Sequence, residues 1–452
     1  MTETTPAGGT PSIPHVPTVP LDPGIDRYIR FGTKWEPYEY TDWIDESESW
    51  KKTCYIGDWS PLTKLRVSGP DALRFFSDIS VNSMAKFDIG QAKHAVFCNE
   101  QGKVMGEGIL MRIAEQEFRF TSGPGAIWAL YRFHTGGYDA VCENVTDEHS
   151  IQQVQGPVSL ELMNEVTGDD LSDIRFMRFR RTSIDGMEFY VLRQGMSGEV
   201  GFEIHGRADE AQKVYARIHE AGQKYGIRRL GGRTKMVNHV EACFPTPTVD
   251  FVPAWYGDDH ADFRAAVAAA GFLEVDYFAG HGGSVPAADL SELYYSPVEL
   301  GWGKSVKFDH EFTGRAALEA EIAAPRRLMR TLVWNADDVV DVFASFFRKE
   351  GRPFDFMEWP RAFLGSVEAD EVLVDGQRVG IATSRCYSYT FREMLSLCVI
   401  DVAHAEPGTQ VEVVWGAPGS PQKRIRATVA QAPYKADRRR AELARPAVGS
   451  TA

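Results

Sequence analysis

Short stretches in which apolar and polar residues alternate recur along the first half of the chain, and this period of two is typical of β-strands. The stretches are Leu62–Val67, Ala92–Cys98, Val104–Ile113, Glu117–Thr121, Met187–Gln194 and Val200–His205. Between them, residues 71–80, 124–134, 158–165 and 209–225 show the apolar spacing of amphipathic helices. Because no long series of parallel strand–helix–strand units appears, the pattern predicts an α+β fold.

The pattern changes after Leu328, where six short apolar stretches follow one another between turn sequences. They are Met329–Trp334, Glu371–Val374, Arg378–Ala382, Ser396–Val402, Gln410–Trp415 and Arg424–Val429. Pairs such as Asp375-Gly376 and Pro407-Gly408 mark turns between these stretches. This part of the chain is therefore predicted to be an all-β barrel or jelly-roll domain.

A chain of 452 residues is too long for one ordinary core, so two or three domains are expected. We predict a flexible N-terminal arm over 1–25, a first α+β domain over 26–150, a second over 151–327 with an irregular insertion at 246–295, a β-barrel over 328–435 and a tail over 436–452. Gly69-Pro70 and Gly156-Pro157 each join a predicted strand to a predicted helix. This repetition suggests that the two α+β domains are related halves.

Charge and cysteine usage restrict the class of partner. The formal net charge of -14 argues against nucleic acid, because phosphate contacts need a basic face. The six cysteines lack the spacing of a zinc site and are interpreted as reduced thiols of a cytoplasmic protein. No apolar run reaches the roughly 18 residues of a membrane span, and no secretory signal is found. Asp258, Asp259, His260 and His281 show no paired spacing, so no metal is predicted.

One glycine-flanked stretch, residues 194–206, contains an unusual carboxylate. Along the strand predicted at 200–205, Phe202 and Ile204 face one side, and Glu203 and His205 face the other. A buried carboxylate needs hydrogen-bond donors, and a flat heterocycle with adjacent N–H groups is one such donor. By spacing alone, two interpretations remain open: Glu203 is an ordinary residue of a surface strand, or it binds a ligand.

Four stretches together resemble the T-protein family, whose members transfer one-carbon units to tetrahydrofolate. Residues 198–204 (GEVGFEI) resemble the family's TGEDGFEI strand, and residues 240–242 (VEA) resemble its LEAG segment. Residues 296–301 with 312–318 resemble TPxExGL and FIGRxAL, and residues 381–384 resemble the VTSG strand of its barrel. The order and spacing match from about residue 50 to residue 434. The resemblance implies three domains that form a ring around a central folate cavity.

Within this family, the chain is most similar to the bacterial tetrahydrofolate-dependent aromatic O-demethylases that act on vanillate, syringate and related methoxybenzoates. The similarity rests on residues 135–138, 301–303 and 306–312 and on the 246–295 insertion. Aminomethyltransferases have an Asp-Asp pair after the corresponding hairpin, whereas here Gly106 occupies the position of the first Asp. The resemblance therefore implies transfer of a methyl group from a methoxylated aromatic acid to N5 of tetrahydrofolate, giving a phenol and 5-methyltetrahydrofolate.

The resemblance also implies roles for individual residues. Glu203 would bind the pterin, with Phe120 and Trp59 near the folate. Ser122 stands where the vanillate enzymes have a carboxylate-binding Arg. Tyr256, and after it His260, are the predicted proton donors to the leaving phenolate. The predicted substrate-binding residues are His239, Ser122 and two residues of the aromatic-rich segment 27–50, which is read either as an arm over a core or as a flap: Tyr40 and Trp43.

Two other functions stay open at this point. An aminomethyl- or N-methyltransferase to tetrahydrofolate would be supported by an Asp at position 106, where the chain has glycine. A non-catalytic folate-binding protein of iron–sulfur assembly shares the fold but carries a Lys-Gly-Cys-Tyr-type motif, which this sequence lacks.

Overall fold

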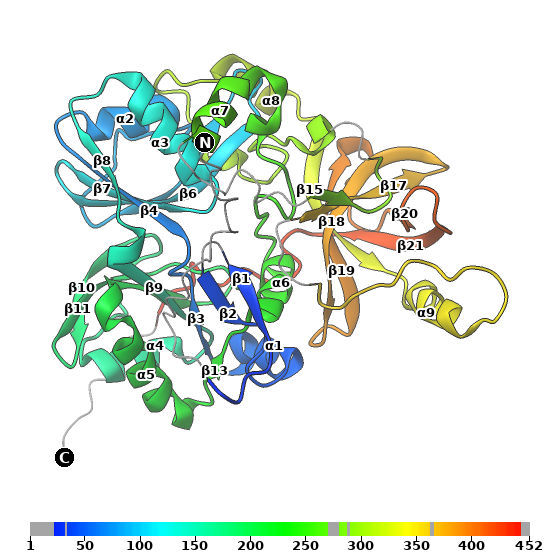
Figure 1. The fold of residues 1–452 in the computed structure, drawn as a ribbon, viewed down its shortest axis with the longest axis horizontal. Helices are drawn as coiled ribbons and strands as arrows, with labels where there is room; N and C mark the ends of the chain where they lie inside the picture. Colours follow the sequence, from blue (N-terminus) through cyan, green and yellow to red (C-terminus); the bar gives the residue numbers. More distant parts are fainter. Residues whose placement is uncertain (1–21, 32–33, 270–279, 287–289, 362–365, 444–452) are drawn as a thin grey trace, which may run out of the picture.

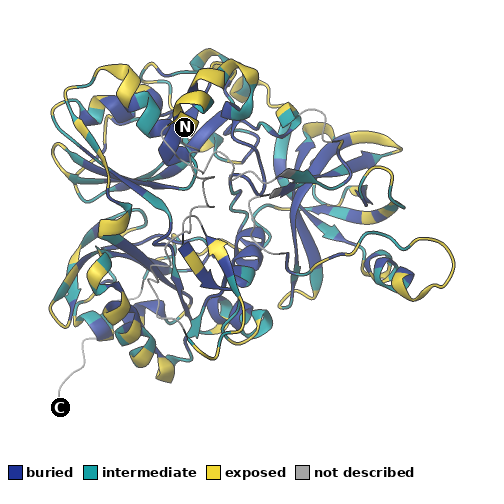
Figure 2. Cartoon of the chain, viewed as in Figure 1, coloured by how far each residue is buried: buried dark blue, intermediate teal, exposed yellow. Residues whose placement is uncertain are grey.

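A computed structural model describes residues 22–31, 34–269, 280–286, 290–361 and 366–443. Three β-sheet units surround a centre that is crossed by helix α6 (Gly232–Glu241) (Figure 1). All residues of α6 except Arg233 are buried, and Figure 2 shows the helix in the buried colour. Helix α6 packs against helix α1 (Trp43–Lys52) on one side and against a strand of the barrel on the other. The expected three-unit ring is thus confirmed.

The first unit is a five-stranded sheet in the order β5-β6-β7-β4-β8. Its strands are β4 (Thr63–Ser68), β5 (Ala92–Cys98), β6 (Val104–Ala114), β7 (Glu117–Ser122) and β8 (Val141–Asn144). Helices α2 (Ala72–Ile79) and α3 (Gly125–Gly136) pack on the sheet and share with it a core that contains Phe75, Phe97 and Phe118. The strands and helices predicted over 62–134 are confirmed within a few residues.

The second unit is a six-stranded sheet in the order β10-β11-β12-β9-β3-β13. Its strands are β3 (Tyr55–Asp58), β9 (His149–Gln155), β10 (Phe179–Ile184), β11 (Met187–Leu192), β12 (Gly201–Arg207) and β13 (Arg228–Arg229). Helices α4 (Ser159–Thr167) and α5 (Ala211–Gly222) complete its core. Each Gly-Pro pair stands between a strand and a helix, β4–α2 and β9–α4, as the repeat predicted.

The predicted boundary between the first two units differs from the observed one. Strand β3 precedes the whole first sheet in sequence, yet it pairs with β9 in the second sheet. The Tyr55 hydroxyl lies 2.6 Å from Gln153 Oε1 and 2.8 Å from Gln155 Oε1, so this pairing also joins buried side chains. Residues 55–58 fall within the range predicted for the first domain, 26–150, but they lie in the sheet of the second unit.

The third unit is a closed barrel in the order β15-β19-β18-β17-β20-β21. The strands are β15 (Arg327–Trp334), β17 (Asp370–Val374), β18 (Gln377–Ser388), β19 (Glu393–Asp401), β20 (Gln410–Trp415) and β21 (Lys423–Ala430). Helix α8 (Arg315–Ala323) precedes the barrel, and helix α9 (Ala336–Ala344) lies between β15 and β17. The predicted all-β domain is confirmed as a barrel.

The segments outside the three sheets connect the units. Near the N-terminus, β1 (Tyr28–Phe31) and β2 (Lys34–Pro37) form a hairpin. In the predicted insertion, α7 (Ala261–Ala269) is followed by β14 (Gly280–Gly282), which pairs with β16 (Ser366–Glu368); residues 270–279 and 287–289 lie outside the described ranges. No helix in the described ranges is long and apolar enough to cross a membrane.

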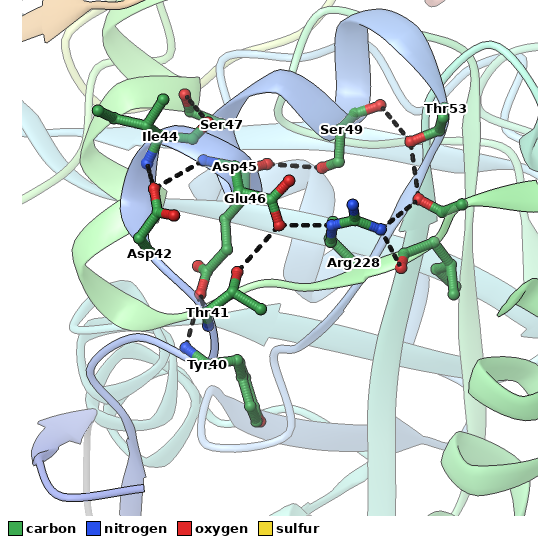
Figure 3. Close-up of polar contacts among 12 residues, drawn as sticks. Tyr40, Thr41, Asp42, Ile44, Asp45, Glu46, Ser47, Ser49, Thr53 and Arg228 are labelled. Atoms are coloured by element: carbon green, nitrogen blue, oxygen red, sulfur yellow. Dashed lines mark hydrogen bonds and ion pairs between the residues drawn. The ribbon is translucent and has the colours of Figure 1, made fainter.

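A buried carboxylate joins the N-terminal segment to α6. Glu46 of α1 is fully buried, and it accepts hydrogen bonds from the backbone N–H groups of Tyr40 (2.6 Å), Thr41 (3.2 Å) and Gly231 (2.8 Å). The Thr234 hydroxyl donates a fourth bond, at 2.7 Å. Figure 3 shows the Glu46 side chain directed toward the turn at Tyr40 and Thr41. This network fixes where the aromatic-rich segment enters α1.

Burial raises the pKa of Glu46 to about 7, although its four donors lower it. Because the folded-state pKa lies above the unfolded value, Glu46 favours folding most below pH 4.5, and this contribution is lost as pH rises through 7. We expect the stability advantage of wild type over Glu46→Gln to shrink by on the order of 3 kcal/mol between pH 4.5 and pH 8. Urea unfolding at several pH values measures this difference. The exposed Glu143→Gln is the control. A stability advantage of wild type over Glu46→Gln that does not change with pH would contradict the raised pKa of Glu46.

Candidate functional site

A cavity of about 140 Å³ opens where the first and second sheets meet, and we call it the inner cavity. Most of its wall is apolar. Its described lining residues include two carboxylates, Glu107 and Glu203, and no Lys or Arg. The lining residues are Phe31, Trp59, Pro61, Leu62, Thr63, Glu107, Gly108, Ile109, Thr121, Ser122, Gly123, Pro124, Ile151, Gln194, Met196, Glu203, Phe244, Thr246, Pro247 and Thr248. Such a site suits a flat, apolar ligand that presents hydrogen-bond donors.

Glu203 is delivered to the inner cavity by strand β12. Phe202 and Ile204 belong to the core of the second unit, while Glu203 and His205 face the other side, as the alternation predicted. The Glu203 side chain is 8% exposed, and its Oε2 atom lies 3.1 Å from His205 Nε2. Burial lowers the pKa of His205, and Glu203 opposes this shift.

Two glutamines orient the Glu203 carboxylate. The Nε2 atoms of Gln153 and Gln194 each donate to Glu203 Oε1 at 3.0 Å. Sequence reasoning did not select these residues. The sequence signal that could have found Gln153 is the row of glutamines in strand β9. Gln153 and Gln155 lie on the same face of that strand, and both are buried. The partners of Glu203 are therefore two neutral amides and an imidazole, which leave acceptor capacity for a ligand.

A second carboxylate enters the inner cavity from strand β6. Glu107 Oε2 lies 2.8 Å from His94 Nε2, and the backbone oxygen of Glu107 accepts a hydrogen bond from Ser122 Oγ at 2.5 Å. The preceding Gly106 cannot carry a side chain, because a Cβ atom there would lie 2.6 Å from the Gly125 Cα atom of α3. The close approach of α3 to β6 therefore leaves no room for an Asp at position 106. Glu107 is the acidic residue of this strand.

The residues predicted near the folate lie at different depths. Trp59 lines the inner cavity, and its Nε1 atom lies 3.1 Å from Met196 Sδ. Phe120 is fully buried in the core of the first unit and packs beneath Gly108, which lines the cavity. Ser122 lines the cavity but donates its hydroxyl hydrogen to the Glu107 backbone.

The predicted proton donors lie outside the set of lining residues. Tyr256 stacks on Trp255 with ring centroids 4.1 Å apart. The His260 ring meets Trp128 edge-on at 5.5 Å, and burial lowers the His260 pKa. His260 thus packs against a residue of helix α3. Tyr256 packs against two hydrophobic clusters, that of the first unit and one that joins the insertion to residues 367–381.

The remaining predicted substrate residues also lie beyond the lining of the inner cavity. His239 is fully buried, with its Nε2 atom 3.5 Å from Asp250 Oδ2 and 3.5 Å from Ser384 Oγ. The Tyr40 ring lies under the Arg229 guanidinium at 4.2 Å, and burial raises the pKa of Tyr40. The Trp43 ring meets Tyr387 of the barrel edge-on at 6.3 Å.

Two protein-family models match this chain, one before the barrel and one within it. The model of the GCVT N-terminal domain matches residues 27–255, and the model of the glycine cleavage T-protein C-terminal barrel domain matches residues 360–435. The glycine cleavage system aminomethyltransferase T from Bartonella henselae has a similar structure, with a TM-score of 0.67 over 92% of this chain and 95% of that chain, at 18% sequence identity. This likeness agrees with the fold.

Similar sequences include a methylene transferase, an O-demethylase and an aminomethyltransferase. A sesamin methylene transferase from Sinomonas sp. (strain No.22) is 37% identical over 88% of this chain and 90% of its own length. A syringate O-demethylase from Sphingobium sp. (strain NBRC 103272 / SYK-6) is 32% identical over the same shares. An aminomethyltransferase from Bacillus cereus (strain B4264) is 24% identical over 92% of this chain and 98% of its own length. The chain therefore belongs to the glycine cleavage T-protein family and is a tetrahydrofolate-dependent transferase.

Proposed function

We propose that the protein removes a one-carbon group from an aromatic ether and transfers it to tetrahydrofolate. In the reaction that we favour, the methyl group of a methoxylated aromatic acid or related methoxyarene moves to N5, giving a phenol and 5-methyltetrahydrofolate. The observation that carries the proposal is the buried Glu203 carboxylate, which faces an apolar cavity and is held by neutral donors. The similarity to the syringate O-demethylase supports the aromatic ether.

The residues of the inner cavity fit the pterin of tetrahydrofolate. Glu203 can accept hydrogen bonds from adjacent N–H groups of a heterocycle, which a charged carboxylate does well in a water-poor site. Apolar side chains such as Trp59, Met196 and Phe244 offer flat surfaces to its ring system. These residues would hold the pterin, while the space beside Glu107 would admit the ring of the ether.

Tetrahydrofolate, when bound, supplies the nucleophilic nitrogen N5. The apolar walls of the inner cavity exclude water and align the two substrates, and alignment alone lowers such a barrier by roughly 7 kcal/mol or more. In this transfer the methoxy C–O bond breaks, the N–C bond forms, and the proton that leaves N5 ends on the phenol oxygen. We assign the handling of this proton to the Glu107 carboxylate, whose Oε2 atom is paired with His94.

A second candidate reaction is transfer of a methylene group, which the 37% identity to the sesamin methylene transferase favours. A methylenedioxy ring would then yield a catechol and 5,10-methylenetetrahydrofolate. Transfer of an aminomethyl group is less favoured, because the packing of Gly106 against Gly125 excludes the Asp of the aminomethyltransferases.

Product analysis separates these reactions. The protein is incubated with tetrahydrofolate and three groups of aromatic compound: methoxybenzoates, neutral methoxyarenes and methylenedioxyarenes. Chromatography then distinguishes 5-methyl- from 5,10-methylenetetrahydrofolate. Because no Lys or Arg lines the inner cavity in the described ranges, we expect neutral rings to react at least as well as benzoates. Absence of a folate product with all three groups would refute the proposed function.

Substitution of Tyr256 tests the proton donor that the sequence favoured. Since Tyr256 stacks on Trp255 outside the lining of the inner cavity, we expect Tyr256→Phe to change the transfer rate by less than about threefold, whereas loss of a true general acid costs about 100-fold or more. Single-turnover rates with a reactive ether provide the measurement, and Glu107→Gln is the comparison. A large loss of transfer rate in a normally folded Tyr256→Phe protein would support Tyr256 as the proton donor.

A further inference from the structure

The segment from residue 340 to residue 356 begins in helix α9 and exposes four large apolar side chains, which we call the aromatic patch. Their exposed fractions are high for apolar residues: Phe347 86%, Phe356 66%, Val340 63% and Phe346 42%. The ring centroids of Phe346 and Phe356 lie 5.7 Å apart, so the helix end and the following loop contribute to one surface. Figure 1 shows α9 on the side of the barrel that points away from the other two units, and Figure 2 shows the following loop in the exposed colour.

Hydrogen bonds and a buried neighbour hold part of the aromatic patch in place. The Asp355 carboxylate accepts from the Ala417 backbone N–H at 2.8 Å, and the Asp355 backbone oxygen accepts from the Trp415 indole N–H at 2.8 Å. Met357 is fully buried in the core of the barrel. Phe356 stands between these two anchors, so a fixed backbone directs its ring outward. A partner that covers a side chain held in this way orders little additional structure.

The area of the aromatic patch fits a protein–protein interface of standard size. Four side chains exposed to this degree present roughly 500 Å² of apolar surface, and patches of this size on a monomer are often functional. A stable complex covers about 800 Å² on each partner, of which about 60% is apolar. The aromatic patch therefore supplies the apolar part of one such interface and needs a polar rim.

Charged residues of both signs provide this rim. Asp337 lies one helical turn before Val340, and Lys349, Glu350 and Arg352 lie in the loop that joins the two halves of the patch; all four charged residues are exposed. None of the four forms an ion pair with the described part of the chain. A symmetric interface places each residue opposite another residue of the same surface, so a rim with two acids and two cations can pair with a second copy of itself. A partner of one charge sign would repel half of this rim.

We propose that the aromatic patch is the interface of a homodimer, in which a second copy of this chain covers Phe347 and Phe356 across a two-fold axis. The rings form the apolar centre, and the cations of each rim meet the acids of the other. The inner cavity lies between the first and second sheets, at a distance from α9, so the dimer leaves it open. The inference is therefore independent of the proposed function.

Sedimentation velocity of the full chain, from about 0.1 to about 50 μM, tests the dimer. We expect the wild type to form a species of twice the chain mass, with a dissociation constant of about 1 μM. Phe347→Ser with Phe356→Ser should raise this constant by about 30-fold, because the two most exposed rings form the centre of the interface. A wild type that stays monomeric at the highest concentration would overturn the inference.

Ile89→Ser with Val141→Ser is the matched control, because both side chains are more than half exposed and both belong to the first unit. This variant should keep the wild-type dissociation constant. Thermal unfolding shows whether both double variants remain folded. Equal weakening of the dimer in the control would mean that association is nonspecific, and it would overturn the assignment of the aromatic patch.

Charge variants test whether the partner is a second copy. Lys349→Glu with Arg352→Glu makes the rim wholly acidic, and Asp337→Lys with Glu350→Lys makes it wholly basic. Each variant alone should dimerise about tenfold more weakly than wild type, whereas a mixture of the two should form heterodimers at least as tightly as the wild-type homodimer in low salt. Native mass spectrometry distinguishes these species by mass. A mixture that forms no heterodimer would overturn the symmetric interface.

A lipid surface is the other chemistry that exposed aromatic rings meet, and vesicle sedimentation tests it. The vesicles contain phosphatidylcholine with or without phosphatidylserine. We expect no binding, because half of the rim is acidic. A monomeric wild type that sediments with the vesicles, with binding lost in Phe347→Ser with Phe356→Ser, would identify a membrane contact and overturn the dimer.

Discussion

Replacement of Glu203 by glutamine will reduce the affinity for tetrahydrofolate by about 100-fold, because a ligand in the inner cavity loses a charged acceptor that water does not replace. The substitution keeps the size of the side chain. It also turns one carboxylate oxygen into an N–H₂ group, which donates and cannot accept. One of the two present acceptors is therefore lost, either the Oε1 that accepts from Gln153 and Gln194 or the Oε2 that contacts His205. The measurement is the dissociation constant of tetrahydrofolate from fluorescence titration.

Stability must be followed beside affinity, because Glu203 belongs to a buried network. Thermal unfolding of Glu203→Gln without ligand shows whether the sheet is retained, and Glu188→Gln, an exposed position on the neighbouring strand β11, is the matched control. Full tetrahydrofolate affinity in a folded Glu203→Gln protein would refute the pterin assignment.

Gly195→Ala will destabilise the protein by about 3 kcal/mol and will also weaken tetrahydrofolate binding, since overpacking of a buried site combines with lost hydrogen bonds. A Cβ atom at position 195 would overlap the side-chain amide of Gln155. That amide donates to the Gln194 backbone oxygen at 3.2 Å and accepts from the Ser197 N–H at 2.9 Å. Moving it displaces Gln194, which holds the Glu203 carboxylate.

Gly206→Ala is the matched control for this substitution. Gly206 lies on the same strand as Glu203, but a Cβ atom there would meet its nearest neighbour, Phe189 Cβ, at an ordinary 3.5 Å. We expect the free energy of unfolding of Gly206→Ala to lie within about 1 kcal/mol of the wild-type value. Urea unfolding of wild type, Gly195→Ala and Gly206→Ala measures these free energies. Equal stabilities would show that Gln155 can leave its position without cost.

The elements of the fold follow from local patterns. Alternating polarity predicted strands β4 to β7 and β12, and the turn-separated stretches after Leu328 predicted the barrel. Such patterns succeed because each strand must direct its apolar face to a core, whichever strand becomes its partner. The same logic placed Phe202 and Ile204 in the core and Glu203 opposite them.

These local patterns could not predict contacts between segments that are distant in sequence. Strand β3 pairs with β9, almost 100 residues later, and Tyr55 meets Gln153 and Gln155 across the two strands. The tail follows the barrel in sequence, yet Arg193 anchors it to the second unit. Neither contact has a local signal, since both depend on how the three units close into a ring.

The sequence by itself determined the family, the three units and the carboxylate Glu203, because strand polarity and the quoted motifs are local properties of the chain. Only the tertiary structure decided what surrounds that carboxylate. It brought Glu107 into the inner cavity and left Tyr256 and His260 among packed aromatic rings. It also gathered six cations around one neighbouring cavity from four separate segments: Lys93, Lys304, Lys307, Arg330, Arg439 and Arg440. The physical reason is that the charge and shape of a cavity come from whichever segments meet there.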